Sequence, residues 1–234
     1  RGTKGPDRRQ AHATHLRPSN QVLTYDIARG LAPEDGGTVA VLLHGRGSHR
    51  GDLQALRPSL PDSWYLVTPQ APHPGHMWGY GPGWAWYKYV EGDEVVEETL
   101  TMSLHAMDTF LAEVPSIVGF TPGRIVLGGF SQGGTVSMAY AITRPGAVAA
   151  ALNFSGFLPG SLEIPFSALS PRVTPIFWAH GLKDLNIPFE LATRGRERLD
   201  GAGVPLSAHD YDAGHWIVPE EVTDAVAFVD SLED

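Results

Sequence analysis

The sequence predicts a single α/β domain with a mostly parallel central sheet that helices cover on both faces. Its 234 residues match one full domain, long enough to bury a core without a disulfide or metal. Short, continuous apolar runs bounded by glycine are typical of strands buried on both faces. Segments with helical periodicity alternate with these runs. This alternation predicts a parallel sheet, because parallel strands need long crossover connections.

Seven segments have the composition of strands. The clearest is 38–43, Thr-Val-Ala-Val-Leu-Leu, where five consecutive apolar residues leave no polar face. A continuous rather than alternating pattern indicates that both faces are covered. In chain order, the expected strands are residues 22–27, 38–43, 64–68, 124–128, 148–154, 175–180 and 204–211.

Four segments between the strands predict helices. From Val96 to Val114, apolar residues recur at intervals of three or four, the spacing of one helix face. Acidic residues crowd its beginning, where the helix dipole favours negative charge, so we interpret them as a solvated helix start rather than a metal site. The other expected helices are residues 132–143, 189–199 and 219–232, and the expected irregular loops are residues 69–83 and 156–174.

The net charge of −9 is unevenly distributed. Residues 1–29 carry six basic and two acidic side chains, so the rest of the chain is strongly acidic. We expect residues 1–19 to be a disordered basic arm and residues 20–234 to form the folded α/β domain. The acidic body argues against a nucleic-acid partner. No apolar run is long enough for stable membrane insertion. We therefore expect a soluble monomer or homodimer acting on a small molecule in the cytoplasm, with a secreted form that has lost its signal as the alternative.

The chain contains no cysteine. Disulfides, cysteine-ligated zinc, iron–sulfur clusters and thiol nucleophiles are therefore excluded. Any covalent nucleophile must be Ser, Thr, Lys, Asp, Glu, His or Tyr.

The strongest chemical signal is Gly129-Phe130-Ser131-Gln132-Gly133, which lies between an expected strand and an expected helix. In a G-x-S-x-G turn of this kind, the glycines permit a sharp reversal that exposes the serine hydroxyl. The following helix N-terminus presents backbone N–H groups that stabilise developing negative charge. We interpret Ser131 as a nucleophile.

A serine nucleophile needs a base, and the base needs an orienting group. Asp184 and His215 each follow an expected strand, and the chain order Ser131, Asp184, His215 is that of the α/β-hydrolase triad. All three would lie at the carboxyl ends of strands, where an open α/β sheet collects its ligands. We expect His215 to be the base and Asp184 to orient it.

Two alternatives to this assignment remain open. Asp212 precedes His215 by three residues and could orient it locally. His180 follows a strand and could be the base, although a buried histidine that fixes the loop carrying Asp184 is the simpler interpretation. His73 and His76 have no neighbouring carboxylate or cysteine, so no metal site is expected there.

An acyl-transfer site also needs donors for an oxyanion. The backbone N–H of Gln132, directly after the nucleophile, is the expected first donor. The loop Leu42-Leu43-His44-Gly45-Arg46-Gly47 follows a buried strand, and we expect the Arg46 N–H to be the second donor. The Arg46 side chain could bind an anionic substrate or point to solvent and the acidic body.

Six motifs together resemble the phospholipase/carboxylesterase family of small α/β-hydrolases, which includes the acyl-protein thioesterases. The resemblance covers about residues 38–230. It implies a compact α/β-hydrolase with little or no cap domain and a cofactor-independent esterase activity. The motifs are Leu43-His44-Gly45-Arg46-Gly47, Pro69-Gln70-Ala71-Pro72, Gly128-Gly129-Phe130-Ser131-Gln132-Gly133-Gly134, Ser155-Gly156-Phe157-Leu158-Pro159, His180-Gly181-x-x-Asp184 and Gly214-His215.

The segment 73–89 departs from the family pattern because it is unusually aromatic. Large amphipathic rings at the rim of a cleft suit the acyl or aromatic groups of neutral esters, although we expect about half of these rings to pack beneath the loop. The expected substrate-binding residues are Trp78, Trp84, Trp86, Leu158, Ile187 and Trp216.

These observations predict a serine carboxylesterase that hydrolyses short to medium neutral carboxylic esters through an acyl-enzyme intermediate. A thioesterase or lactonase would use the same triad with a different pocket. A non-catalytic α/β-hydrolase scaffold that binds a ligand through the aromatic segment is the alternative from another class.

Overall fold

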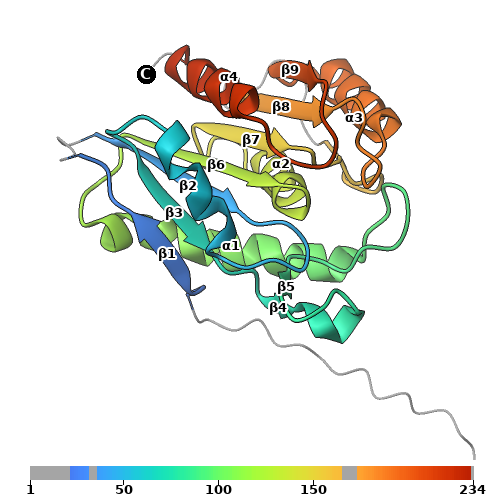
Figure 1. Cartoon of the computed structure of the whole chain (residues 1–234), viewed down its shortest axis with the longest axis horizontal. Coiled ribbons are helices and arrows are strands. Elements are labelled where there is room, and N and C mark those ends of the chain that lie inside the picture. Colours follow the sequence, from blue (N-terminus) through green and yellow to red (C-terminus); the bar gives the residue numbers. More distant parts are fainter. Residues whose placement is uncertain (1–21, 32–35, 165–172, 233–234) are drawn as a thin grey trace, which may run out of the picture.

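The computed structural model describes residues 22–31, 36–164 and 173–232. The arm predicted at residues 1–19 lies outside these ranges. Within them, seven strands form one sheet in the order β1-β3-β2-β6-β7-β8-β9, with only β1 antiparallel to its neighbour (Figure 1). The strands are β1 (Tyr25–Ala28), β2 (Thr38–Leu43), β3 (Tyr65–Pro69), β6 (Arg124–Phe130), β7 (Ala150–Phe154), β8 (Ile176–Gly181) and β9 (Leu206–Tyr211).

Helices cover both faces of this sheet, as predicted (Figure 1). Helices α1, α2 and α3 pack on one face, while α4 and the 3-10 helix η1 pack on the other. The helical elements are η1 (Asp52–Ser59), η2 (Gly75–Trp78), α1 (Glu97–Val118), α2 (Gln132–Thr143), α3 (Phe189–Gly201) and α4 (Pro219–Asp230).

The position of strand β2 between two helical layers explains why its sequence is continuously apolar. Val41 packs in the core beneath α1, whereas its neighbours Ala40 and Leu42 pack in the core beneath α4 and η1. Because successive side chains of a strand point to opposite faces, each face of β2 needs its own apolar residues. The two helical layers therefore require the run that predicted this strand.

The predicted elements recur with small shifts at their ends. Strand β2 and helix α2 have the predicted bounds, whereas β1 begins three residues later than expected because only residues 25–28 pair with β3. The segment 69–83, expected to be irregular, contains η2 and the strand β4 (His73–Pro74), which pairs with β5 (Trp84–Ala85). Elements this short have no periodic pattern that a sequence could reveal.

The sheet brings distant parts of the chain to one edge. Strands β2, β6 and β8 run parallel with β9, so their carboxyl ends all lie at the same edge of the sheet. Ligand sites of open parallel sheets form at this edge. Among the described helices, none combines the length and apolar character needed to cross a bilayer.

Candidate active site

Ser131 lies in a strained turn between β6 and α2. Its φ of 55° and ψ of −116° fall in a region that non-glycine residues rarely adopt. Such a conformation costs about 1–3 kcal/mol and persists only when the surroundings impose it. Here the Ser131 N–H donates to the Phe154 carbonyl at 2.8 Å, and the Ser131 carbonyl accepts from Thr135 at 3.0 Å. The turn is therefore held by neighbouring β7 and by α2.

The glycines of this turn allow the chain to pass very close to β2. A Cβ atom at Gly133 would lie 2.0 Å from the carbonyl oxygen of Leu43, which is far inside van der Waals contact. Any side chain here would push the turn away from the sheet. The G-x-S-x-G pattern thus reflects a tight approach that fixes the position of the serine.

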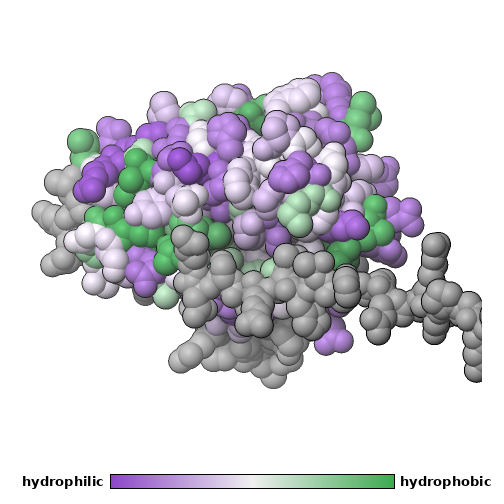
Figure 2. Space-filling model, turned by 90° about the horizontal axis from the view of Figure 1, so that it is seen from below, coloured by the Kyte–Doolittle hydropathy of each residue, from purple (hydrophilic) through white to green (hydrophobic). Residues whose placement is uncertain are grey.

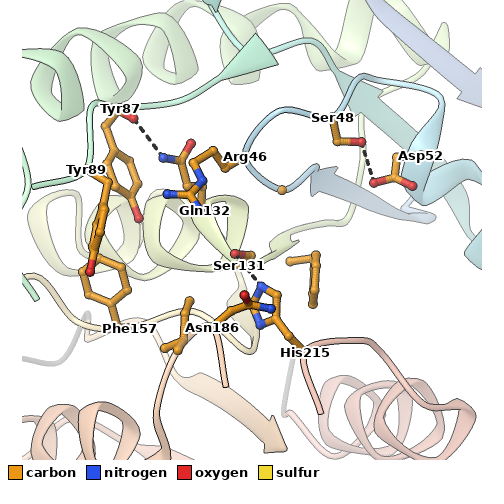
Figure 3. A pocket seen from close by; sticks show the side chains of 13 residues that line it. Arg46, Ser48, Asp52, Tyr87, Tyr89, Ser131, Gln132, Phe157, Asn186 and His215 are labelled. Carbon is orange, nitrogen blue, oxygen red and sulfur yellow. Dashed lines mark hydrogen bonds between the residues drawn. The ribbon is translucent and has the colours of Figure 1, made fainter. Parts of the chain in front are cut away.

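The structure brings the three predicted catalytic residues into one hydrogen-bonded series. His215 Nε2 lies 3.0 Å from Ser131 Oγ, and His215 Nδ1 lies 2.6 Å from Asp184 Oδ2 (Figure 3). Ser131 comes from the end of β6, Asp184 follows β8 and His215 follows β9. With Nδ1–H donating to the carboxylate, Nε2 is free to accept the serine proton.

Asp184 is well placed to remain ionised. Its side chain is fully buried, and burial alone would raise the pKa of the carboxyl group. The hydrogen bond from His215 and the backbone N–H groups of Ile187 and Asn186, at 2.8 and 2.9 Å, outweigh burial and hold the pKa below its usual value. An ionised carboxylate accepts only, so it specifies which nitrogen of His215 carries the proton.

The two competing residues have other partners. Asp212 is exposed and pairs with Lys183, with 2.5 Å between Oδ1 and Nζ. His180 is fully buried, its Nε2 lies 2.9 Å from the Ile187 carbonyl oxygen, and burial lowers its pKa. His180 therefore braces the loop that carries Asp184, which is the simpler of the two roles considered for it.

The loop after β2 passes directly above the nucleophile. A Cβ atom at Gly45 would lie 3.6 Å from the Cβ atom of Ser131. Within the described ranges, the backbone N–H groups of Arg46 and Gln132 donate to no protein acceptor. Both remain available as the pair of oxyanion donors that the sequence predicts.

A buried histidine that sequence reasoning did not assign anchors this loop. His44 Nδ1 donates to the Gly45 carbonyl at 2.8 Å, and Nε2 accepts from the backbone N–H of Ala71 at 3.1 Å. Burial lowers the pKa of His44 to about 4, so the ring is neutral at pH 7 and can play both roles. The His-Gly-Arg-Gly motif contained this residue, but only its glycines and Arg46 suggested a function.

Hydrogen bonds also join the aromatic segment to the nucleophile turn. The Gln132 side chain accepts from the Trp86 backbone N–H at 3.0 Å and donates to the Tyr87 carbonyl at 2.9 Å. The Trp86 indole N–H donates to the His44 carbonyl at 2.9 Å, and the Ser103 hydroxyl donates to the Trp86 carbonyl. Trp86 thus holds together the two loops that carry the predicted oxyanion donors.

A cavity of about 380 Å³ opens beside Ser131 (Figure 3). One side of it is aromatic and apolar, and Ile187 is among its lining residues, as predicted. A second hollow of about 240 Å³ also borders His215, and Trp216, with 58% of its surface exposed, contributes to its wall. The cavity is lined by Gly45, Arg46, Ser48, Asp52, Tyr87, Tyr89, Phe130, Ser131, Gln132, Phe157, Asn186, Ile187 and His215.

Five of the six residues predicted to contact substrate do not line the 380 Å³ cavity: Trp216 lines the second hollow, and the other four lie elsewhere. Trp86 is 0% exposed because its indole N–H is satisfied within the core. Leu158 packs in the core beside Trp178 and α3. Trp84 packs against the core beneath α1, and Trp78 stacks on His73 with 4.8 Å between ring centroids. The sequence shows where rings cluster but not which way each ring points.

The two histidines of the aromatic segment, His73 and His76, differ in their surroundings. His73 is buried against Trp78, and burial lowers its pKa, whereas His76 is exposed. In the described part of the chain, no group of three or more His, Asp or Glu side chains converges as metal ligands would.

Glu221 is a buried carboxyl group that the sequence did not single out. It occupies the first turn of α4, is 0% exposed, and neither of its carboxyl oxygens has a hydrogen-bond partner among the described residues. Burial, assisted by the charge of Asp184, raises the pKa of Glu221 to about 7. The folded protein therefore binds a proton at this carboxyl more tightly than the unfolded chain does.

Glu221→Gln is expected to change how stability depends on pH. The pKa of Glu221 is higher in the folded protein than in the unfolded chain. Protonated Glu221 therefore contributes its full stabilisation to the folded wild type below about pH 4.5, and this contribution is lost as pH rises through about 7. Glutamine cannot ionise, so the variant should gain about 3 kcal/mol in the free energy of unfolding relative to the wild type between pH 4 and pH 8. Urea unfolding across this range measures the difference. The exposed neighbour Glu220→Gln is the control, and parallel curves for the wild type and Glu221→Gln would contradict the prediction.

Comparison with known proteins places this chain in a wider family. The family described as Phospholipase/Carboxylesterase matches residues 32–233. The chain is 32% identical to acyl-protein thioesterase 1 of Gibberella zeae over 175 residues, covering 69% of this chain and 73% of that protein. It is 26% identical to acyl-protein thioesterase 1 of Saccharomyces cerevisiae over 209 residues, covering 81% of this chain and 90% of that protein.

Solved structures share the fold. Esterase PE8 is 25% identical with a TM-score of 0.73, and the match covers 91% of this chain and all of that chain. The carboxylesterase of Bacillus cereus has a TM-score of 0.74 at 18% identity, covering 92% of this chain and 96% of that chain. The second likeness concerns the fold alone.

Proposed function

The chain belongs to the phospholipase/carboxylesterase family of hydrolases, and on that premise we propose that it is a serine carboxylesterase acting on short to medium neutral carboxylic esters. The observation that carries this proposal is the hydrogen-bonded series from Asp184 through His215 to Ser131 beside an open cavity. This is the arrangement that a serine needs to become a nucleophile at neutral pH.

In the proposed reaction, Ser131 Oγ attacks the ester carbonyl carbon while His215 Nε2 takes the serine proton. The backbone N–H groups of Arg46 and Gln132 hold the negative charge that develops on the carbonyl oxygen. The tetrahedral intermediate expels the alcohol, which receives its proton from His215, and an acyl-enzyme remains. Water, deprotonated by His215, then attacks the acyl group, and the acid leaves as Ser131 recovers its proton.

The volume and the lining residues of the cavity support the proposed preference for short to medium neutral esters. A volume of about 380 Å³ lies at the lower end for small-molecule sites. Tyr87, Tyr89, Phe157 and Ile187 supply apolar surface for an acyl or aryl group. The excess of acidic residues over the whole chain disfavours the approach of strongly anionic molecules.

A thioesterase is the second candidate, because relatives that cover most of this chain are named acyl-protein thioesterase 1. The same nucleophile, base and oxyanion donors would serve a thioester or a lactone, and only the fit of the substrate would differ. A non-catalytic scaffold has no physical need for three polar side chains in hydrogen-bond contact, so the arrangement of Ser131, His215 and Asp184 favours an enzyme.

A series of 4-nitrophenyl esters tests the proposal directly. We expect kcat/KM to be highest between acetate and octanoate and to fall by roughly tenfold or more at palmitate, because a longer chain exceeds the cavity. S-phenyl thiobutyrate and γ-butyrolactone, measured beside phenyl butyrate, rank the three bond types. A steep optimum at palmitate, or faster turnover of the thioester than of its oxygen analogue, would overturn the short-ester assignment.

A further inference from the structure

Arg46 presents an uncompensated positive charge to the cavity. Its guanidinium carbon lies 4.9 Å from the ring centroid of Tyr80 and 5.7 Å from that of Tyr89. Among the residues that the structure describes, no carboxylate or carbonyl oxygen forms a hydrogen bond or ion pair with this guanidinium. The sequence left open whether this side chain faces the acidic body or the substrate. In the structure, Arg46 is among the residues that line the cavity.

The absence of a carboxylate partner for Arg46 is unexpected, because the chain has 26 acidic and only 17 basic residues. Other arginines of this chain find an acid: the closest nitrogen–oxygen distances are 2.9 Å for Arg50 with Asp26, 2.9 Å for Arg144 with Asp108 and 2.6 Å for Arg196 with Asp210. Arg46, next to the nucleophile, is instead held by aromatic rings. Rings position a cation without neutralising it.

Among the described residues, the N–H donors of the Arg46 guanidinium have no acceptor. The guanidinium carbon of Arg46 lies over the rings of Tyr80 and Tyr89, and the five N–H donors of the group form a planar fork. Such a fork matches the two oxygens of a carboxylate. Figure 3 shows Arg46 and Ser131 facing the same cavity, so a bound carboxylate would lie on the same molecule as the reacting ester.

The other charged group of the cavity does not cancel this one. Asp52 accepts a hydrogen bond from the Ser48 hydroxyl at 2.7 Å, and Figure 3 shows it set apart from Arg46. A single carboxylate would be matched by one guanidinium, whereas a phosphate dianion would leave one charge uncompensated near Asp52. The distant acidic residues of the body act weakly inside the cavity, because salt screens charges beyond about 8 Å at physiological ionic strength.

We propose that Arg46 binds a carboxylate of the substrate, so that the enzyme prefers esters carrying one carboxylate to neutral esters of equal size. This inference rests on the proposed esterase function and revises its preferred substrates: neutral esters of this size are hydrolysed, but esters carrying one carboxylate are hydrolysed faster. Arg46 then has two separate parts in the site: its backbone N–H contacts the oxyanion and its side chain selects the substrate.

Matched substrate pairs test the preference. The pair 4-acetoxybenzoate and 4-acetoxybenzamide places the charge on the leaving group, and the pair monoethyl glutarate and ethyl glutaramate places it on the acyl group. We expect the ratio of kcat/KM for the anionic over the neutral member to exceed one in at least one pair. Arg46→Gln should lower that ratio by about 10- to 100-fold, and Arg46→Lys should give an intermediate value. The ratio is used because any disturbance of the oxyanion donor affects both members equally.

Two controls sharpen this test. Arg29→Gln removes an exposed positive charge without changing the cavity, and it should leave the ratio unchanged. Added salt should reduce the ratio in the wild type but not in Arg46→Gln. If Arg46→Gln fails to fold, Arg46→Lys and the salt dependence of the wild type decide. Hydrolysis of neutral esters with ratios independent of Arg46 would overturn this inference alone, whereas no hydrolysis of any ester would overturn the proposed function.

Discussion

Ser131→Ala is expected to lower kcat by roughly 10⁴- to 10⁶-fold, the loss seen when a triad serine is removed. Without Oγ there is no acyl-enzyme, and only water held near the oxyanion donors can react. The folded structure should change little, because alanine keeps the Cβ atom and the backbone hydrogen bonds that hold the turn. Hydrolysis of 4-nitrophenyl butyrate measures the loss, with the exposed Ser63→Ala as a control.

A fluorophosphonate probe distinguishes a covalent nucleophile from a bystander. The wild type should be labelled and Ser131→Ala should not. His215→Ala should cost nearly as much turnover as Ser131→Ala, and the double variant should lose little more than either alone, because the two residues act as one unit. Labelling of Ser131→Ala, or additive losses in the double variant, would remove Ser131 from the proposed mechanism.

Asp184→Asn is expected to reduce kcat by roughly 10⁴-fold with little change in the packing around it. The amide nitrogen would face His215 Nδ1 and favour the tautomer with its proton on Nε2, which cannot accept from the serine. Asp212→Asn removes only an exposed ion pair with Lys183 and should leave kcat within about twofold of the wild type.

The comparison of these two variants decides which aspartate orients the base. Circular dichroism and urea unfolding check that both variants fold, since the Asp184 carboxylate also accepts two backbone N–H groups of its loop. A large loss in Asp212→Asn with near-normal turnover in Asp184→Asn would reverse the assignment. Similar losses in both would point to a disturbed loop rather than a disturbed tautomer.

The parts of this protein that the sequence predicted are those with a strong local cause. The bounds of β2 followed from two buried faces, and the turn at Ser131 followed from glycines that a close approach to β2 requires. Asp184 and His215 could be chosen because parallel strands bring their carboxyl ends together, so position along the chain implies proximity in space.

The remaining features depend on the orientations of individual side chains, which the sequence pattern does not encode. Trp84 and Trp86 differ by two positions, yet only Trp86 is completely buried, because its indole nitrogen meets a carbonyl oxygen from another loop. The stacking of Arg46 on Tyr80 likewise joins residues more than thirty positions apart along the chain. Contacts of this kind arise from the packed structure rather than from local periodicity.

Trp86 and Trp78 lie in the same aromatic segment but should change at different rates during evolution, because they differ in their contacts to the loops beside Ser131. A change at Trp86 would remove the indole hydrogen bond to the His44 carbonyl and a fully buried ring, so lineages that keep the chemistry should rarely lose it. The ring contacts of Trp78 are with His73 and Tyr80 of its own segment, so a change at Trp78 should disturb the loops beside Ser131 less. Substitutions at Trp78 should therefore accumulate in related proteins while the reaction stays the same.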